Sequence, residues 1–214
     1  MNKSIADIRQ DYRMRSLSES DAAPNAITQF ETWWKEAVKS EISEPNAMTL
    51  ATASADGVPT ARIVLLKDFD ERGFVFFTNY NSLKGEQLHE NPRACVVFFW
   101  KELERQIRIM GVIEKVSPAE SDEYFNSRPE GSRIGAIVSP QSSVIESRDW
   151  LESQVAAAAQ ELTGRDIPRP EYWGGYRVRP AIIEFWQGRS NRLHDRLQYS
   201  LSDDGEWKIE RLAP

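Results

Sequence analysis

The tract from Ile183 to Arg196 holds the densest group of side chains that could bind an anionic, aromatic ligand. It contains a phenyl ring, an indole ring, three arginines and one of the two histidines of the chain. If its second half is extended, Arg192, His194 and Arg196 share one face, because strand side chains alternate with a period of two. Guanidinium groups beside an imidazole suit a phosphate- or carboxylate-bearing ligand. An exposed polar strand with salt bridges through Asp195 would explain the same residues.

Basic and hydroxyl side chains also gather in two segments nearer the middle of the chain. Arg62 and Lys67 bracket an apolar strand core and face opposite ways by strict alternation. They can serve one site only if Lys67 lies past the strand end or the strand is strongly twisted. Residues 77–84 run from a strand through a polar turn to a helix start, which offers N–H groups, hydroxyls and Lys84 to an anion. Snorkelling strand-end charges and plain N-capping by Ser82 are the alternatives.

Three further segments carry weaker signals for ligand binding. Gln106, within a predicted strand, could hydrogen-bond a heterocycle. Tyr124 and Arg128 are four residues apart and could meet at a helix C-terminus, where Ser132 would complete a common phosphate-binding set. Residues 139–143 are expected at the N-terminus of the next helix, which again favours an anion. A helix end followed by a loop, and an ordinary helix cap, explain the last two segments equally well.

Composition narrows the class of protein. The length of 214 residues fits one domain, and the 40% hydrophobic and 28% charged residues are ordinary for a globular chain. A net charge of −6 argues against a nucleic-acid binder, so local basic groups would serve a small anionic ligand. The N-terminus lacks a secretory signal, and no apolar run approaches the roughly 20 residues that span a membrane. The single Cys95 excludes internal disulfides and favours a cytoplasmic protein.

Common catalytic and metal motifs are absent from the sequence. Two histidines and one cysteine, without HExxH or CxxC, leave no convincing metal site. GxSxG, Walker and GxGxxG sequences are absent as well. A catalytic triad would need His89 or His194 beside a nucleophile, and neither neighbourhood suggests one.

Hydrophobic periodicity and turn signals predict a chain that is mainly β with α additions. Strands are expected at residues 48–53, 60–67, 74–78, 94–100 and 105–116, and near Tyr176, Ile182, Arg192 and Trp207. Helices are expected at residues 27–40 and 82–90, from a capping box at Ser117 to about Ser127, and from a second box at Ser143 to about Leu162. Six to eight mostly antiparallel strands would close into a small barrel with flanking helices, because closure removes sheet edges. Residues 1–25 would form a mobile N-terminal arm or lid, and residues 26–214 a single domain with helical insertions.

Taken in order, these segments resemble the pyridoxine/pyridoxamine 5′-phosphate oxidase family. The match runs from about Ile8 to Pro214. It is carried by Arg62–Lys67, Phe77–Asn79, Leu103–Gln106, Tyr124–Phe125 with Ser127–Pro129, Gln141–Ser143, Tyr172–Gly175, the tract 183–196 and the ending Arg211–Pro214. Each motif alone is weak, but their order along the chain is specific. The resemblance implies an FMN-binding split β-barrel and a homodimer with FMN at the subunit interface.

The resemblance also implies roles for individual residues. Those that would contact FMN are Arg62, Ile63, Val64, Leu65, Leu66, Lys67, Phe77, Thr78, Lys84, Gln106, Gln141, Ser142, Trp186 and Arg196. Those that would hold the substrate phosphate are Lys67, Tyr124, Arg128 and Ser132. Arg192 and His194 would lie over the substrate ring as catalytic residues, and Arg9 and Tyr12 would form a lid from the N-terminal arm.

The implied reaction is oxidation of pyridoxamine 5′-phosphate or pyridoxine 5′-phosphate to pyridoxal 5′-phosphate. Hydride would pass from C4′ to flavin N5, and O2 would reoxidise the flavin and yield H2O2. Leu83 stands where the family usually has an arginine, and Phe77 replaces a frequent tyrosine. The alternatives are a split-barrel flavin reductase with another substrate and a non-catalytic protein that binds flavin or pyridoxal phosphate. Aerobic turnover would separate the oxidase from a carrier.

Overall fold

The computed structural model describes residues 4, 5, 8, 10–162 and 164–214. The chain forms two compact units, each built from separate stretches of sequence. The first comprises residues 1–49, 95–111 and 180–214, and the second comprises residues 50–94 and 112–179. No helix in the described stretches combines the length and apolar character that crossing a membrane requires.

Nine strands form one hydrogen-bonded sheet within the described residues. They are β1 (Ala47–Ala53), β2 (Pro59–Leu65), β3 (Asp68–Asp70), β4 (Gly73–Asn79), β5 (Arg93–Trp100), β6 (Arg105–Lys115), β7 (Trp173–Gln187), β8 (Asp195–Leu201) and β9 (Trp207–Arg211). Their order is β2-β1-β5-β6-β7-β4-β3, with β8 paired to β7 and β9 paired to β8. The β3–β4, β4–β7, β7–β8 and β8–β9 pairs are antiparallel. The prediction of a mainly β fold is confirmed, and the strand that the sequence did not indicate, β3, is too short for a periodic signal.

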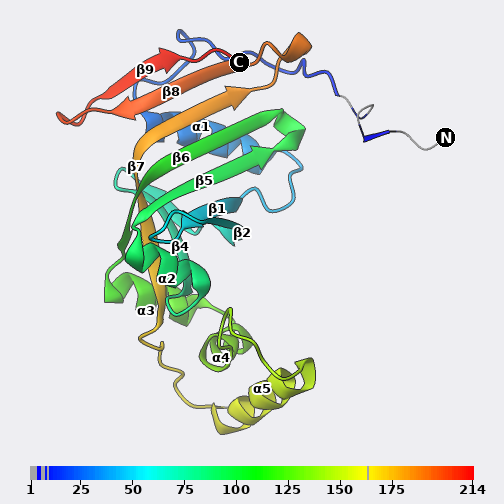
Figure 1. The fold of residues 1–214 in the computed structure, drawn as a ribbon, viewed down its shortest axis with the longest axis vertical. Helices are drawn as coiled ribbons and strands as arrows, with labels where there is room; N and C mark the ends of the chain where they lie inside the picture. The colour runs from blue at the N-terminus through cyan, green and yellow to red at the C-terminus, as the bar shows by residue number, and fades with distance from the viewer. Residues whose placement is uncertain (1–3, 6–7, 9, 163) are drawn as a thin grey trace. The chain divides into compact units, whose positions relative to one another are not determined.

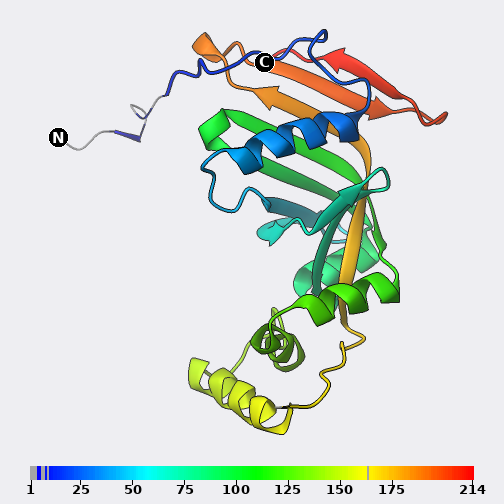
Figure 2. The same cartoon turned by 180° about the vertical axis from the view of Figure 1, so that it is seen from behind.

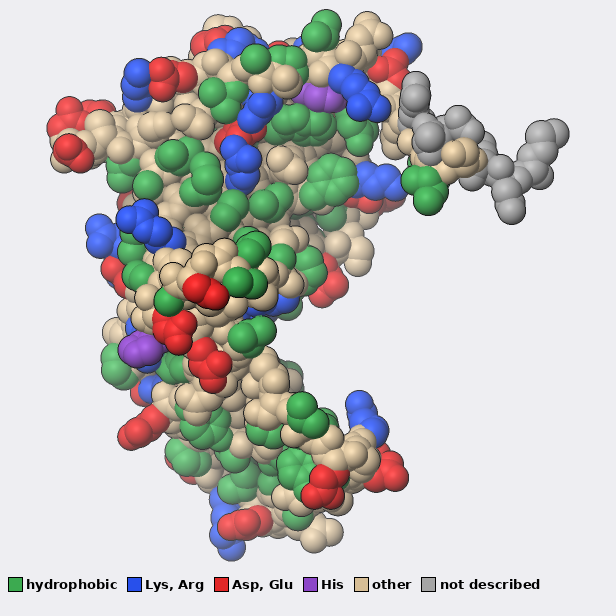
Figure 3. Space-filling model, viewed as in Figure 1, with side chains coloured by type: hydrophobic (Ala, Val, Ile, Leu, Met, Phe, Trp, Pro, Cys, Tyr) green, Lys and Arg blue, Asp and Glu red, His purple; other side chains and the backbone are tan. Residues whose placement is uncertain are grey.

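Helix α1 (Ala26–Lys39) covers one face of the strands in the first unit (Figure 2). The Asn25 side chain caps it by accepting hydrogen bonds from two backbone N–H groups of the first turn. Its buried Trp33 meets Phe185 of β7 edge to face, with ring centroids 5.3 Å apart. The opposite face of β5 is open, since Phe99 is 54% exposed, and hydrophobic side chains show at the surface there (Figure 3).

The C-terminal strands complete the first unit, and β8 and β9 lie side by side along β7 (Figure 1). The sequence predicted separate strands near Tyr176 and Ile182, but β7 is one strand of 15 residues. Its beginning pairs with β4 and its end pairs with β8. Trp186 on β7 lies directly opposite Arg196 on β8.

The predicted strand through Arg192 is wrong. Residues Ser190–Arg192 form a short 3-10 helix, and β8 begins only at Asp195. Asn191 and Arg192 have left-handed backbones, with φ values of 56° and 62°, which turn the chain instead of extending it. Arg192 and His194 therefore precede the strand that carries Arg196, and the three side chains do not share a strand face.

Helix α3 (Pro118–Ser127) has the bounds that the sequence predicted. The Ser117 side chain accepts from the Glu120 backbone N–H, and the Glu120 side chain accepts from the Ser117 N–H. Arg128 leaves the helix with φ −75° and ψ 148°, as expected for a residue before proline. The helix end that carries Tyr124 and Arg128 is therefore encoded locally.

Helix α4 (Glu130–Val138) was not predicted, because it has no side-chain cap at Pro129 and contains two glycines. Tertiary burial stabilises it instead. Ile134 is buried in a cluster with Phe125 and Trp173. This helix carries Ser132 in its first turn.

Helix α5 (Arg148–Leu162) begins later than the predicted capping box at Ser143. The Ser143 backbone N–H donates to the Pro140 carbonyl in a turn, and Ser142 has a left-handed φ of 73°. Ser147 is the residue whose hydroxyl accepts from a first-turn N–H, that of Trp150, at 3.0 Å. Residues 139–143 therefore belong to the loop between α4 and α5, which lie side by side (Figure 1), and not to a helix N-terminus.

Helix α2 (Leu83–Glu90) generates a stability prediction, because its Gly85 packs against the Tyr80 backbone. A Cβ added at Gly85 would lie 2.0 Å from the Tyr80 carbonyl oxygen. Gly85→Ala should therefore lower the free energy of unfolding by about 2–3 kcal/mol, measured by urea unfolding followed by circular dichroism.

Gly131→Ala, in α4, is the matched control, because a Cβ there meets nothing within 4 Å. It should leave stability unchanged or raise it by up to about 1 kcal/mol. Equal effects of the two substitutions would contradict the tight packing of α2.

Candidate ligand-binding site

The second unit contains a cavity of about 520 Å³, a size typical of small-molecule sites. It is lined by Ile63, Val64, Leu65, Lys67, Phe77, Thr78, Lys84, Tyr124, Arg128, Pro129, Ser132, Gln141 and Trp173. Every lining residue except Pro129 and Trp173 was predicted from the sequence as a site residue. Strands β2 and β4, helices α2, α3 and α4 and the loop after α4 thus contribute to one cavity.

Neutral groups surround the ammonium of Lys84, one of the residues that line the cavity. Its Nζ donates to Ser82 Oγ at 2.9 Å, to Gln141 Oε1 at 2.8 Å and to Thr78 Oγ1 at 3.2 Å. Burial, and secondly the positive charge of Arg62, lower the pKa of Lys84 to about 8. A nearby anion would relieve both effects.

Arg62 is a second cation, whose charge acts on Lys84, and neutral groups hold it too. Its guanidinium donates to Thr52 Oγ1 at 2.5 Å and to Thr60 Oγ1 at 2.6 Å. Both threonine hydroxyls in turn donate to Gln87 Oε1, at 2.6 and 2.7 Å, so Gln87 orients them as acceptors for the arginine. Burial lowers the pKa of Arg62. The side chain lies outside the cavity lining, and its positive charge lowers the pKa of Lys84, which is in that lining.

Arg128, which also lines the cavity, lies over an aromatic floor. Its guanidinium carbon lies 4.6 Å from the ring centroid of Trp173, which stacks on Phe77 at 5.7 Å. Tyr124 stacks on both rings, with its centroid 4.0 Å from that of Phe77 and 6.1 Å from that of Trp173. Nη1 of Arg128 is buried and lacks a partner among the described residues, and burial lowers the pKa of this arginine. A buried donor without a partner is costly, so it marks a position that a ligand oxygen could fill.

From the sequence, Lys67 and Arg62 can serve one site only if Lys67 lies past the strand end, and the structure meets this condition. Strand β2 ends at Leu65, so Lys67 lies past the strand end, and its Nζ lies 5.7 Å from the ring centroid of Tyr124. Ser132 lines the same cavity from the first turn of α4. The side chains predicted to hold a phosphate are thus together, although one of them lies on a helix that the sequence did not predict.

Some predicted residues lie outside this cavity lining. Leu66 is buried, and Ser142 is exposed in the loop after α4. Leu83, where the family usually has an arginine, is 47% exposed at the start of α2. Arg9 is not among the residues that the structure describes.

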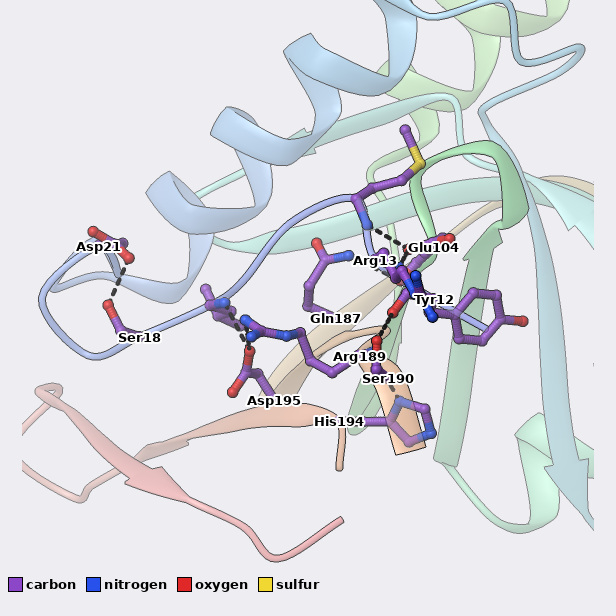
Figure 4. Close-up of polar contacts among 12 residues, drawn as sticks. Tyr12, Arg13, Ser18, Asp21, Glu104, Gln187, Arg189, Ser190, His194 and Asp195 are labelled. Carbon is purple, nitrogen blue, oxygen red and sulfur yellow. Dashed lines mark hydrogen bonds and ion pairs between the residues drawn. The ribbon is translucent and has the colours of Figure 1, made fainter. Parts of the chain in front are cut away.

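In the first unit, Tyr12, Trp186 and His194 form an aromatic group. The ring centroids of Trp186 and His194 are 4.5 Å apart, and Tyr12 meets Trp186 edge to face at 5.9 Å. The backbone N–H of Arg189 donates to His194 Nδ1 at 3.1 Å (Figure 4). Burial, and secondly the charge of Arg192, lower the pKa of His194. The ring is therefore neutral near pH 7, with its proton on Nε2.

Arg196 is fixed beside this aromatic group by a buried carboxylate. Its Nε donates to Glu184 Oε1 at 2.8 Å, while Arg108 donates to Glu184 Oε2 at 2.5 Å. Two cations and one carboxylate leave a net positive charge on this surface. Gln106 is half-buried on the same strand as Arg108, and Arg192 is exposed.

Sequence reasoning gave no role to Trp173, Gln87 or Glu184. Trp173 was part of a quoted motif, but nothing local shows that it lies beneath Arg128, since 45 positions separate them. Gln87, on α2, accepts from Thr52 and Thr60 of β1 and β2. Glu184, on β7, accepts from Arg108 of β6 and Arg196 of β8. Among the described residues, no group of three or more His, Cys, Asp or Glu could hold a metal ion.

Comparison with known proteins gives two family matches. Residues 34–161 match the profile described as pyridoxamine 5′-phosphate oxidase. Residues 173–214 match the one described as the pyridoxine 5′-phosphate oxidase C-terminal dimerisation region.

Full-length relatives and solved structures agree with these matches. Pyridoxine/pyridoxamine 5′-phosphate oxidases from Cyanothece sp. and Nostoc punctiforme are each 58% identical over 214 residues, covering 100% of both chains. The structure of PhzG from Burkholderia lata 383, in complex with tetrahydrophenazine-1-carboxylic acid, is 31% identical, with a TM-score of 0.89 over 96% of this chain and 100% of that one. A pyridoxamine 5′-phosphate oxidase-related, FMN-binding protein from Nostoc punctiforme shares the fold, with a TM-score of 0.72 and 17% identity over 90% of this chain and 100% of that one.

The environment of Lys84 generates a pH prediction for anion binding. A bound phosphate monoester favours the ammonium form, so above pH 8 binding must first return a proton to Lys84. The association constant should be level from pH 7 to about 8 and then fall by up to about tenfold per pH unit. Titration calorimetry in buffers of different ionisation enthalpy would measure the proton uptake.

Lys84→Arg provides the control, because a guanidinium stays charged throughout this range. Its binding should lose most of the pH dependence. A wild-type pH dependence in this variant would mean that another group takes up the proton.

Proposed function

This chain belongs to the pyridoxine/pyridoxamine 5′-phosphate oxidase family, and on that premise we propose that it oxidises pyridoxamine 5′-phosphate and pyridoxine 5′-phosphate to pyridoxal 5′-phosphate. The observation that carries the proposal is the cavity of the second unit, whose lining includes the three cations Lys67, Lys84 and Arg128. Lys84 contacts neutral side chains, whereas Arg128 and Lys67 each lie near an aromatic ring. Two separate phosphate-binding groups suit a cofactor and a substrate that each carry one phosphate.

The donor set around Lys84 and Arg62 fits the phosphate of FMN. Arg62 and Lys84 have neutral hydroxyl, amide and carbonyl partners, so their charges remain available to a dianion. Thr78 and Gln141 would also contact the phosphate, because the Thr78 hydroxyl and the Gln141 amide already contact Lys84. Residues 63–65 and Phe77 supply apolar and backbone surface for the rest of the flavin. FMN, when bound, accepts the hydride from substrate C4′ and passes the electrons to O2, which yields H2O2.

We further propose that FMN binds at the subunit interface of a homodimer, with Gln106, Ser142, Trp186 and Arg196 among its contacts. The dimerisation region matched by residues 173–214 supports the homodimer. The open face of β5, where Phe99 is half exposed, is the kind of apolar surface that a second subunit covers. A cytoplasmic location stays a prediction from the single cysteine.

The substrate phosphate would be bound by Arg128, Lys67, Tyr124 and Ser132. The unpartnered Nη1 of Arg128 supports this role, because a phosphate oxygen would satisfy it. Trp173 lies beneath the Arg128 guanidinium and stacks on Phe77, which supports a fixed position for this arginine. Holding the phosphate fixes the direction of C4′, which lowers the entropy cost of reaction.

His194 and Arg192 would orient the ring end of the substrate. Because His194 Nδ1 accepts from the Arg189 N–H, the neutral ring presents Nε2–H as a donor. This arrangement supports a hydrogen-bonding role for His194 over a role as general base. The exposed guanidinium of Arg192 would stabilise negative charge on the substrate.

Aerobic turnover tests the proposed function directly. Purified protein loaded with FMN should convert pyridoxamine 5′-phosphate to pyridoxal 5′-phosphate and form H2O2 in equal amount. Absorbance of the aldehyde and a peroxidase-coupled assay would measure the two products. Folded protein that binds FMN but forms neither product from either substrate would exclude the oxidase and favour a carrier.

Substitution of Arg128 should damage turnover without removing the flavin. Arg128→Ala removes a charged fork from the substrate phosphate, so kcat/KM should fall about 100-fold, mainly through KM. FMN affinity should change by less than about threefold, because the FMN phosphate is assigned to Lys84 and Arg62.

Arg148→Ala is a suitable control, since that side chain is 79% exposed on α5. It should leave both quantities unchanged. A loss of FMN binding in Arg128→Ala with an unchanged KM would reverse the two phosphate assignments.

A further inference from the structure

The N-terminal arm, from Tyr12 to Leu17, is attached to the first unit through its backbone (Figure 4). The N–H groups of Arg13 and Met14 both donate to Oε2 of Glu104, each at 2.9 Å. Further along, the Leu17 N–H donates to Asp195 Oδ2 at 3.1 Å. A carboxylate that accepts two backbone N–H groups is a strong acceptor. Since these bonds use the backbone, they fix the path of the arm whatever its side chains are.

Glu104 is set in position independently of the arm. Its backbone has a left-handed φ of 54°, and its carbonyl accepts from the Gly188 N–H at 2.7 Å and from Gln187 Nε2 at 3.2 Å. Gln187 is itself held by Arg105, whose Nε donates to Gln187 Oε1 at 2.9 Å. A non-glycine residue keeps a left-handed backbone only where its surroundings enforce it, and such positions concentrate at functional sites. The Glu104 side chain is thus directed at the arm by the turn that carries it.

The consequence of this attachment is the position of the Tyr12 ring. The ring lies so close to the Gly188 backbone that a Cβ at Gly188 would come within 2.7 Å of Tyr12 Cγ. Ser190 Oγ donates to the Tyr12 carbonyl at 3.2 Å. Seated there, the ring meets Trp186 at 5.9 Å and His194 at 6.1 Å. The residue next to the Glu104 anchor therefore completes the aromatic group of the first unit.

We propose that Glu104 is a positioning residue, whose carboxylate anchors the arm so that Tyr12 packs against Trp186 and His194. The residue is only 5% exposed, and its side chain serves the arm. Its effect on turnover rests on the proposed function, because it acts through Tyr12 and His194 at the ring end of the substrate. The anchoring itself does not depend on catalysis and can be measured separately.

Limited trypsin cleavage after Arg13 reports the anchoring without reference to turnover. FMN-loaded Glu104→Ala protein should be cut there about tenfold faster than wild type, because local opening of the arm no longer breaks two charge-assisted bonds. Glu104→Gln keeps an acceptor oxygen but loses the charge, and should be cut at an intermediate rate. Glu102→Ala is the matched control, since Glu102 is exposed in the same turn. Equal cleavage rates in wild type, Glu104→Gln and Glu104→Ala would overturn the proposal.

A double-mutant cycle tests whether the anchor acts through Tyr12. Tyr12→Ala and Glu104→Ala should each lower kcat/KM for pyridoxamine 5′-phosphate about tenfold, with unchanged FMN content. The kcat/KM of the double variant should be no more than about twofold below that of the less active single variant. Effects that multiply would show that Glu104 acts by another route and would overturn the proposal. If wild-type protein forms no pyridoxal phosphate, the proposed function fails, while the cleavage rates still decide the anchoring.

Discussion

In the second unit, neutral partners hold the cations Arg62 and Lys84, whereas carboxylates hold the buried Arg177. Arg177 is buried and forms ion pairs with Asp70 at 2.8 Å and Glu120 at 2.9 Å. Arg62 and Lys84, in contrast, contact hydroxyl, amide and carbonyl oxygens. An ion pair would neutralise the charge that an anionic ligand requires, so the choice of partner decides whether a buried cation can bind a ligand.

This arrangement has a cost that the surrounding structure must offset. Burial lowers the pKa values of Arg62, Lys84 and Arg128, which means that the charged forms are destabilised where they stand. Arg62 and Lys84 donate hydrogen bonds to hydroxyl and amide oxygens, which fix the geometry of these two cations in advance, so that little reorganisation is needed when an anion binds. The tight packing of α2 on the Tyr80 backbone and the Gln87 network behind Arg62 maintain that geometry.

Carboxylates have the opposite use in the first unit, where they position other groups. Glu184 joins Arg108 to Arg196, and Asp195 contacts Arg189, Arg211 and the Leu17 backbone. Glu104 accepts from the arm backbone alone at Oε2. Carboxylates in this unit therefore hold several arginines and the backbone of the N-terminal arm.

Sequence alone determined the features that depend on neighbouring residues. The capping box at Ser117 and the proline after Arg128 set both ends of α3, and hydrophobic periodicity located most strands. The order of short motifs indicated the family and nearly all residues that line the cavity.

Tertiary structure alone decided the features that depend on distant partners. Helix α4 exists because Ile134 is buried against Phe125 and Trp173, and Gln141 reaches Lys84 from a loop 57 positions away. The left-handed turn at Arg192 broke the alternation that had put Arg192, His194 and Arg196 on one face. Local patterns carry local preferences, but the contacts that override them form only when the chain has folded.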